Sequence, residues 1–289
     1  MYKDLTICIP AYNEERSIVP ILQELKTAFV ESEIIVVDDG SVDKTRKVAA
    51  SVSGVTVLFH ERNMGYGAAL KTAMRNASRK MVLWYDADGQ HRVEDVKRIV
   101  QPVLSGEKDV VIGVRKYNLL ENPDRVPGKL ILKIVAELIA REKVPDLNSG
   151  FRCFRSDVIK KYLHLLPDGF SASTTSTLLM MKRGYRVGYE EIVTRKRIGK
   201  STVKIFSDGI KTLHLMLRIL VLFEAFSFFT FLSSLQVIPG IIYGFYIAFT
   251  VHQGFPTFAS MVIISGIFTF FMGILCDQIT ELRKEKFEE

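Results

Sequence analysis

The sequence predicts an α/β protein in which a mostly parallel sheet is followed by an amphipathic interfacial helix and two transmembrane helices. Short apolar, β-branched runs alternate with amphipathic segments in the first part of the chain, which is typical of parallel sheets covered by helices on both faces. Between Ala225 and Cys276 the chain then contains no Asp, Glu, Lys or Arg. Such an uncharged run is rare in soluble domains.

Five strands are predicted, because five short apolar runs each end in turn residues. They cover residues 5–10, 33–39, 55–60, 80–86 and 108–114. The first intervening segment has apolar residues at helical spacing, at Ile18, Ile21, Leu22 and Leu25. Ser41 is predicted to cap the helix after the second strand, since a serine hydroxyl can accept from free N–H groups there.

The uncharged run is long enough for two spanning helices, each of which needs about 20 apolar residues. They are expected at residues 226–250 and 257–276, and a buried hairpin in a soluble protein is the alternative. Lys and Arg flank the pair and are absent from the loop between the helices, so both termini are expected in the cytoplasm of a multi-pass cell-membrane protein. Lys211 and Arg218 share one face of the preceding segment, as expected of a helix in the headgroup layer.

Acidic and small residues gather where the predicted strands end. Because the carboxyl ends of parallel strands meet at one edge of the sheet, a ligand site is expected there. Turns alone also use Asp and Gly, but four successive strand ends of this kind exceed what turns require. The chain has no GxGxxG after its first strand and no GxxxxGK[ST], which excludes the usual dinucleotide and P-loop sites.

Four motifs in order, IPAYNEERSI, VVDDGSVDKT, NMGYGAAL and DADGQH, resemble those of family 2 glycosyltransferases with the GT-A nucleotide-sugar-binding fold. Two later motifs, LNSGFRCFRSDVI and RKRIGKSTVK, resemble those of the polyprenyl-phosphate glycosyltransferases. This group includes dolichyl-phosphate mannose synthase and the undecaprenyl-phosphate glucosyltransferases. The likeness covers residues 4–205. It implies inverting, metal-dependent transfer of one sugar from a UDP- or GDP-sugar to a polyprenyl phosphate at the cytoplasmic membrane face.

The resemblance also implies roles for individual residues. Asp86 and Asp88, helped by Gln90, would hold Mg²⁺ or Mn²⁺, which prefer hard oxygen ligands. The predicted nucleotide-binding residues are Pro10, Tyr12, Glu14, Asp38, Asp39, Gly65, Gly67 and Lys71. His60, His91 and His164 are isolated and are expected in the core or on the surface. Asn148 and Ser149 are expected to line the acceptor or sugar side.

A polyprenyl monophosphate is already anionic near neutral pH, because its second pKa is about 6. It needs cations more than a general base. The predicted acceptor-phosphate residues are Arg115, Arg125, Lys129, Arg195, Arg197, Lys200, Ser201 and Lys204, and Arg115, Arg125 and Arg197 are predicted to be catalytic with Asp86 and Asp88. Surface solvation is the alternative for each cation. The family's last motif is often Gly-x-Ser-Lys, so Lys200 and Lys204 both stay candidates.

The expected organisation is a glycosyltransferase domain (1–204), an amphipathic juxtamembrane helix (205–224), a transmembrane hairpin (225–280) and a charged cytoplasmic tail (281–289). The expected partners are the nucleotide sugar, the lipid phosphate and the membrane. No nucleic acid is expected despite the net charge of +7, and self-association is considered through Ser265, Gly266 and Gly273.

Two other functions are considered. A processive family 2 polysaccharide synthase typically carries Gln-x-x-Arg-Trp, whereas the one tryptophan here is Trp84. A non-catalytic membrane-tethered nucleotide-sugar-binding protein is the other. The sequence does not name the sugar, the nucleotide or the lipid length.

Overall fold

The structure is a computed structural model that describes residues 2–115, 134, 136–137, 139–169, 171–195, 205–250 and 254–285. For residues 205–216, 219 and 283–285 it describes the backbone alone. The chain divides into two compact units, Met1–Asp208 and Gly209–Glu289.

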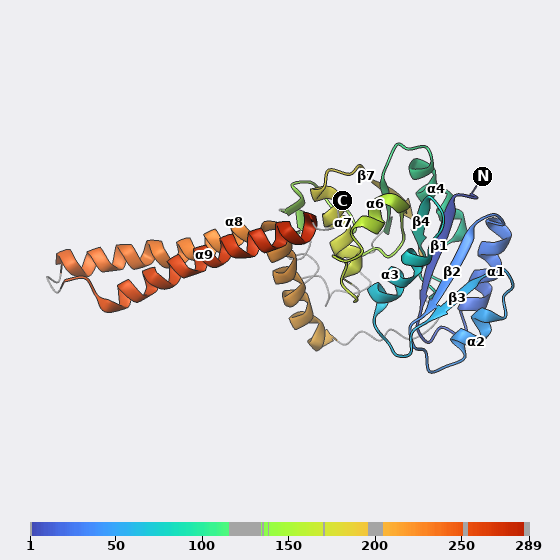
Figure 1. Cartoon of the computed structure of the whole chain (residues 1–289), viewed down its shortest axis with the longest axis horizontal. Helices are drawn as coiled ribbons and strands as arrows, with labels where there is room; N and C mark the ends of the chain where they lie inside the picture. The colour runs from blue at the N-terminus through green and yellow to red at the C-terminus, as the bar shows by residue number, and fades with distance from the viewer. Residues whose placement is uncertain are drawn as a thin grey trace. The chain divides into compact units, whose positions relative to one another are not determined.

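The first unit is built on a sheet whose strands lie in the order β3-β2-β1-β4-β6-β5-β7. Figure 1 shows β3, β2, β1 and β4 side by side. The strands are β1 (Leu5–Ala11), β2 (Glu33–Asp38), β3 (Thr56–Phe59), β4 (Met81–Trp84), β5 (Val110–Arg115), β6 (Arg152–Arg155) and β7 (Val187–Ile192). The five predicted strands are confirmed as β1 to β5. β1, β2, β3 and β4 pair in parallel, as do β5 and β7.

β6 and β7 were not predicted. β6 runs antiparallel to both of its neighbours, β4 and β5. Trp84 at the end of β4 pairs with Arg152 at the start of β6. The residues that enter β6 therefore lie beside the residues that leave β4, at the carboxyl edge of the parallel strands.

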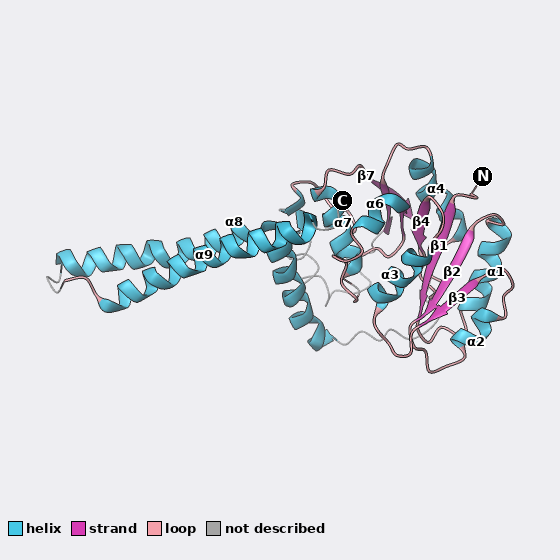
Figure 2. Ribbon diagram, viewed as in Figure 1, coloured by secondary structure: helices cyan, strands magenta, loops and turns pink. Residues whose placement is uncertain are grey.

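Helices cover both faces of the sheet (Figure 2). They are α1 (Ile18–Ala28), α2 (Thr45–Ala50) and α4 (Val93–Leu104) on one face, and α3 (Tyr66–Asn76), α6 (Ser156–Lys161) and α7 (Ala172–Lys182) on the other. The four apolar residues predicted for the first helix are all buried in the core beneath α1. Each fully buried Leu or Ile stabilises the fold by roughly 1.5–3 kcal/mol.

The predicted cap at Ser41 is wrong. α2 begins at Thr45, with Lys44 at the N-cap position. The Ser41 hydroxyl instead accepts from the backbone N–H of Asn13, at 2.9 Å. The serine therefore joins two loops at the sheet edge, because the extra residues 42–44 carry the chain away before the helix starts.

The second unit holds α8 (Ile205–Thr250) from Gly209 onward and α9 (Thr257–Glu285). α8 has non-helical backbone at Glu224. Leu220–Thr250 and Thr257–Leu282 are long and apolar enough to cross a membrane. Ala259, Gly266, Gly273 and Thr280 recur every seven residues and are all buried. A Cβ at Gly266 would lie 2.5 Å from Val237.

The two helices therefore pack closely along a seam of small residues. Ser233 adds a hydrogen bond across it, donating to the carbonyl of Gly266 at 2.7 Å. Gly266 and Gly273, which were considered for contacts between copies, face α8 of the same hairpin. Self-association stays a prediction, and it would need another face of the hairpin.

Candidate functional site

Asp86 lies at the carboxyl edge of the sheet, directly after β4, and protein groups contact both of its carboxylate oxygens. The Tyr66 hydroxyl donates to Oδ1 at 2.8 Å, and His91 Nε2 lies 3.2 Å from Oδ2. A Cβ added at Gly150, in the segment that enters β6, would lie 2.6 Å from Oδ2. The carboxylate is thus enclosed on three sides, and 27% of the side chain is exposed.

Two opposing effects act on this carboxylate. Burial raises the pKa of Asp86, because it penalises the charged form. The hydrogen bonds from His91 and Tyr66 and the charge of Arg115 lower it and prevail, so the pKa lies below its ordinary value. Asp86 is therefore ionised at neutral pH.

His91 is itself fixed by its surroundings. Its ring stacks on Phe151 with the centroids 4.6 Å apart, and its backbone carbonyl accepts from the Tyr85 hydroxyl at 2.8 Å. Since a carboxylate can only accept, Nε2 carries the proton toward Asp86. Within the part of the chain that the structure describes, the buried Nδ1 of His91 has no hydrogen-bond partner.

Asp88 and Gln90 complete the loop after β4. The backbone N–H of Gln90 donates to Asp88 Oδ1 at 3.0 Å, and the carbonyl of Gln90 accepts from the Arg195 N–H at 2.8 Å. The Arg195 side chain lies 3.4 Å from Glu24 on α1. The described residues hold no cluster of three His, Cys, Asp or Glu side chains that could bind a metal alone.

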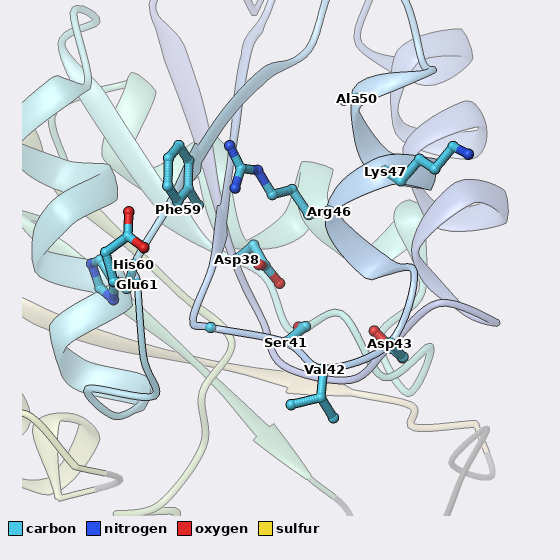
Figure 3. A pocket seen from close by; sticks show the side chains of 11 residues that line it. Asp38, Ser41, Val42, Asp43, Arg46, Lys47, Ala50, Phe59, His60 and Glu61 are labelled. Carbon is cyan, nitrogen blue, oxygen red and sulfur yellow. The ribbon is translucent and has the colours of Figure 1, made fainter.

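Asp38, the last residue of β2, and Asp39, the residue that follows it, lie on opposite sides of the strand, because successive side chains alternate there. Asp39 accepts from the N–H groups of Met64 and Gly65, at 2.9 and 2.8 Å, and from His60 Nδ1 at 2.7 Å. Asp38 is 3% exposed and lines an open pocket of about 520 Å³ (Figure 3). No described residue contacts its Oδ1 by a hydrogen bond.

That pocket lies between the segment after β2 and the end of β3. Arg46 of α2 places its guanidinium 3.3 Å from the centroid of the Phe59 ring (Figure 3). Lys47 and Glu61 also line the pocket. Its lining therefore carries both signs of charge.

The loop after β1 is joined to the loop after β2. Asn13 adopts a left-handed backbone with φ of 57°, and its Oδ1 accepts from the Val42 N–H at 2.9 Å. The Glu14 N–H donates to Thr45 at 2.7 Å, and the Glu14 carboxylate accepts from Ser17 at 2.8 Å. Tyr12 is 42% exposed. Pro10 lies inside β1 and leads directly into this loop.

Gly65 and Gly67 permit a close approach, and the segment that approaches is the chain's own residues 167–169. A Cβ at Gly65 would lie 2.5 Å from the carbonyl oxygen of Asp168, and one at Gly67 would overlap that of Pro167. Lys71 also contacts Asp168, and it donates to the Leu166 carbonyl at 3.1 Å. Their predicted contact with a nucleotide stays a prediction.

Arg115, at the end of β5, forms a bidentate ion pair with the buried Asp146. The Nε–Oδ2 and Nη2–Oδ1 distances are 2.8 and 3.0 Å. Asp146 in turn accepts from the Asn148 N–H at 3.1 Å, and Thr174 of α7 donates to Asn148 Oδ1 at 3.1 Å. The other predicted cations and Ser201 lie outside the described residues: Arg125, Lys129, Arg197, Lys200, Ser201 and Lys204.

Arg152 is a supporting residue that sequence reasoning missed. It is fully buried and donates to the carbonyls of Ser149 and Ser173 at 3.0 and 2.7 Å. Burial lowers its pKa to about 10. It ties the segment before β6 to the start of α7, and a signal was available in the hydroxyl-rich sequence ASTTST of that helix.

Comparisons with known proteins match both units. The glycosyl transferase family 2 model matches residues 6–163, and a model of the GtrB C-terminal hairpin matches residues 227–282. An uncharacterized protein of Methanocaldococcus jannaschii is 36% identical over 192 residues, which are 64% of this chain and 78% of that protein.

A second relative and a solved structure complete the comparison. UDP-N-acetylglucosamine–dolichyl-phosphate N-acetylglucosaminyltransferase of Methanococcus voltae is 30% identical, over 55% of this chain and 72% of that protein. Glucosyl-3-phosphoglycerate synthase of Mycobacterium tuberculosis, solved with Mn²⁺, UDP and phosphoglyceric acid, has a TM-score of 0.61 at 19% identity. That match covers 75% of this chain and 77% of the other, and it establishes a shared fold.

Proposed function

The chain belongs to glycosyl transferase family 2, and we propose that it transfers one sugar from a nucleotide sugar to a polyprenyl phosphate with inversion at the anomeric carbon. The observation that carries this proposal is the ionised Asp86 beside Asp88 at the end of β4. Ligands of open α/β sheets bind at that edge. A C-terminal hairpin able to cross a membrane accompanies it in the same chain.

The nucleoside is proposed to bind at the ends of β1 and β2. The exposed ring of Tyr12 offers a stacking surface, next to Pro10 and Glu14. An ionised carboxylate has about four acceptor sites, and Asp39 already accepts from Met64, Gly65 and His60. The remaining acceptor site of Asp39 suits one N–H of a base. Asp38 supports the nucleoside from the opposite side of the strand.

The residues present fit a divalent cation such as Mg²⁺ or Mn²⁺. Asp86, Asp88 and Gln90 offer carboxylate and amide oxygens, the ligand type that these ions prefer. The protein supplies only part of a coordination sphere from its described residues, which leaves positions for diphosphate oxygens and water. When bound, the cation would neutralise charge on the diphosphate as it leaves.

The acceptor is proposed to be a polyprenyl phosphate, whose anionic oxygen attacks the anomeric carbon. The bond from that carbon to the diphosphate breaks, and its electron pair stays with the diphosphate oxygen. Direct in-line attack inverts the configuration. Such an acceptor needs orienting cations more than a base. We propose that Arg115 at the end of β5, whose guanidinium is held by Asp146, contributes one.

Two further observations support a lipid acceptor. The Methanococcus voltae relative is named for a dolichyl-phosphate acceptor. The first turns of α7, which contact Asn148 through Thr174, carry hydroxyls and no carboxylate. Hydroxyls can donate hydrogen bonds to a phosphate, whereas carboxylates would repel it. We propose that the hairpin spans the cell membrane with both termini in the cytoplasm, because Lys and Arg flank both helices.

The test is sugar transfer by the purified full-length chain in lipid–detergent micelles. A thermal-shift panel of UDP- and GDP-sugars with Mn²⁺ first selects the donor, since a ligand of the folded state raises the melting temperature. The labelled donor is then incubated with dolichyl or undecaprenyl phosphate. Label is expected in the butanol extract, and the Asp88→Ala variant is expected to leave it empty. Label in long polymer, or binding without turnover, would contradict the proposal.

A further inference from the structure

We propose that Tyr66 and His91 are positioning residues, which together fix the Asp86 carboxylate before the metal and nucleotide arrive. This inference rests on the proposed function, because it concerns the same site. Each residue contacts a different oxygen of Asp86, at 2.8 and 3.2 Å. The orientation of the carboxylate is therefore set by the protein, and a preset orientation reduces the cost of binding.

Tyr66 can hold this position because the backbone at the start of α3 packs directly against the backbone of residues 167–169. The Ala68 N–H donates to the Asp168 carbonyl at 3.0 Å. Gly65 has a φ of 106°, a backbone conformation that residues other than glycine rarely adopt. At Gly65 and Gly67 a Cβ would meet the carbonyls of residues 168 and 167. The Gly-Tyr-Gly motif is thereby explained as a device that places the phenol.

His91 closes the loop that contains Asp88. The loop leaves β4 at Tyr85, and the Tyr85 hydroxyl returns to the His91 carbonyl at 2.8 Å. The His91 ring then points back to Asp86, against the face of Phe151. The segment between Asp86 and His91 is thus held at both ends, and Asp88 lies between them.

Gly150 forms the third side of the enclosure. A methyl group there would lie 2.6 Å from Asp86 Oδ2 and 2.7 Å from the Tyr66 hydroxyl. The fit is tight enough that neither the carboxylate nor the phenol could keep its place beside a larger residue. Gly150 therefore belongs to the same positioning arrangement.

The test compares Tyr66→Phe and His91→Phe with the wild-type chain. Each keeps a ring and deletes one donor. We expect each to weaken the binding of Mn²⁺ in the presence of UDP about tenfold, measured by the electron paramagnetic resonance signal of free Mn²⁺, because hydrogen bonds to charged groups are strong. His91→Gln, which keeps an N–H donor, is expected to recover part of that loss.

Tyr162→Phe is the matched control. Tyr162 is also buried, and its hydroxyl lies 3.3 Å from that of Tyr185, away from Asp86. Wild-type Mn²⁺ binding is expected for this variant. In an Asp86→Asn background, Tyr66→Phe should cause no further loss, since the group it positions is gone.

The outcomes separate this inference from the proposed function. Wild-type Mn²⁺ binding by folded Tyr66→Phe and His91→Phe would overturn the inference, as would fully additive losses in the Asp86→Asn background. A Tyr66→Phe chain that fails to fold would assign the phenol to stability and would overturn it too. Weakened Mn²⁺ binding in a chain whose wild type transfers no sugar to lipid would refute the proposed function alone.

Discussion

At the ends of both β2 and β4 a histidine binds an acid, but the two histidines differ in how many of their ring nitrogens have partners. Two acids lie at each end, and one of them, Asp39 or Asp86, is bound by a histidine and by the segment Met64–Tyr66. His60 has partners on both ring nitrogens, since Nε2 lies 2.9 Å from the Thr72 hydroxyl. His91 has a described partner on Nε2 only.

This difference indicates different roles. At Asp39 both ring nitrogens of the histidine have partners within the protein, so loss of this network should affect folding first. At Asp86 the Nδ1 atom of His91 has no described partner, and the neighbouring Asp88 accepts from the loop backbone. Its loss should affect ligand binding first. Because Met64–Tyr66 contacts both acids, the two strand ends are mechanically joined.

The largest expected effect is at Asp88. Asp88→Ala should reduce sugar transfer to lipid by more than about a thousandfold, because the charge on the leaving diphosphate loses its main protein-held counterpart. Membrane insertion and the melting temperature should be unchanged. Asp157→Ala is the control, since that acid is exposed and pairs with Arg155. Full activity of Asp88→Ala would refute the metal assignment.

The second prediction separates Asp38 and Asp39, the two acids at the end of β2. Asp39→Asn should lower the free energy of unfolding by about 1–3 kcal/mol, because an amide nitrogen facing Met64 or Gly65 leaves a partly buried N–H unpaired. Asp38→Asn should cost less, since Oδ1 of Asp38 has no described partner to lose. Denaturant unfolding of the ligand-free protein measures both. A larger loss for Asp38→Asn would contradict the comparison.

The sequence was sufficient for β1 to β5, the strands that alternate with helices along the chain. β1 to β5 are apolar runs with no competing interpretation, and the acids that follow them necessarily meet at one edge. β6 was missed because RCFR carries two arginines and reads as a surface segment. Its buried Arg152 is tolerated only because α7 supplies hydroxyls and carbonyls to it, and no local pattern reveals that pairing.

The site shows the same limit. The strand-end acids could be found from spacing, but the partners of those acids come from distant segments. His60 and His91 were expected to be isolated, and each contacts an acid. The motif around Tyr66 suggested a close backbone approach by a ligand, and residues 167–169 of the chain itself approach it there. Contacts of this kind depend on tertiary structure, which a single sequence does not encode locally.

The smallest expected effect concerns an acid away from both strand ends, and it tests whether acid–cation pairing alone makes an acid important. Asp109, just before β5, is held by Arg186 at 3.0 Å and by Arg155 at 3.1 Å. The hydrogen bonds of Arg186 lower the pKa of Asp109 from 3.8 to about 2. A lowered pKa stabilises the fold above the unfolded value, and the gain is lost as pH falls from about 4 to 2.

Asp109→Asn should therefore flatten the fall of the melting temperature between about pH 4 and pH 2 and leave sugar transfer unchanged. The cost at neutral pH should be below about 1 kcal/mol, because Arg186 and Arg155 are largely exposed to solvent. Thermal unfolding of both proteins across that pH range provides the measurement. Parallel curves for the two proteins would mean that the Asp109 pairs add nothing to stability. A loss of sugar transfer would mean that the amino edge of β5 is coupled to the site at the carboxyl edge, and that Asp109 does not serve stability alone.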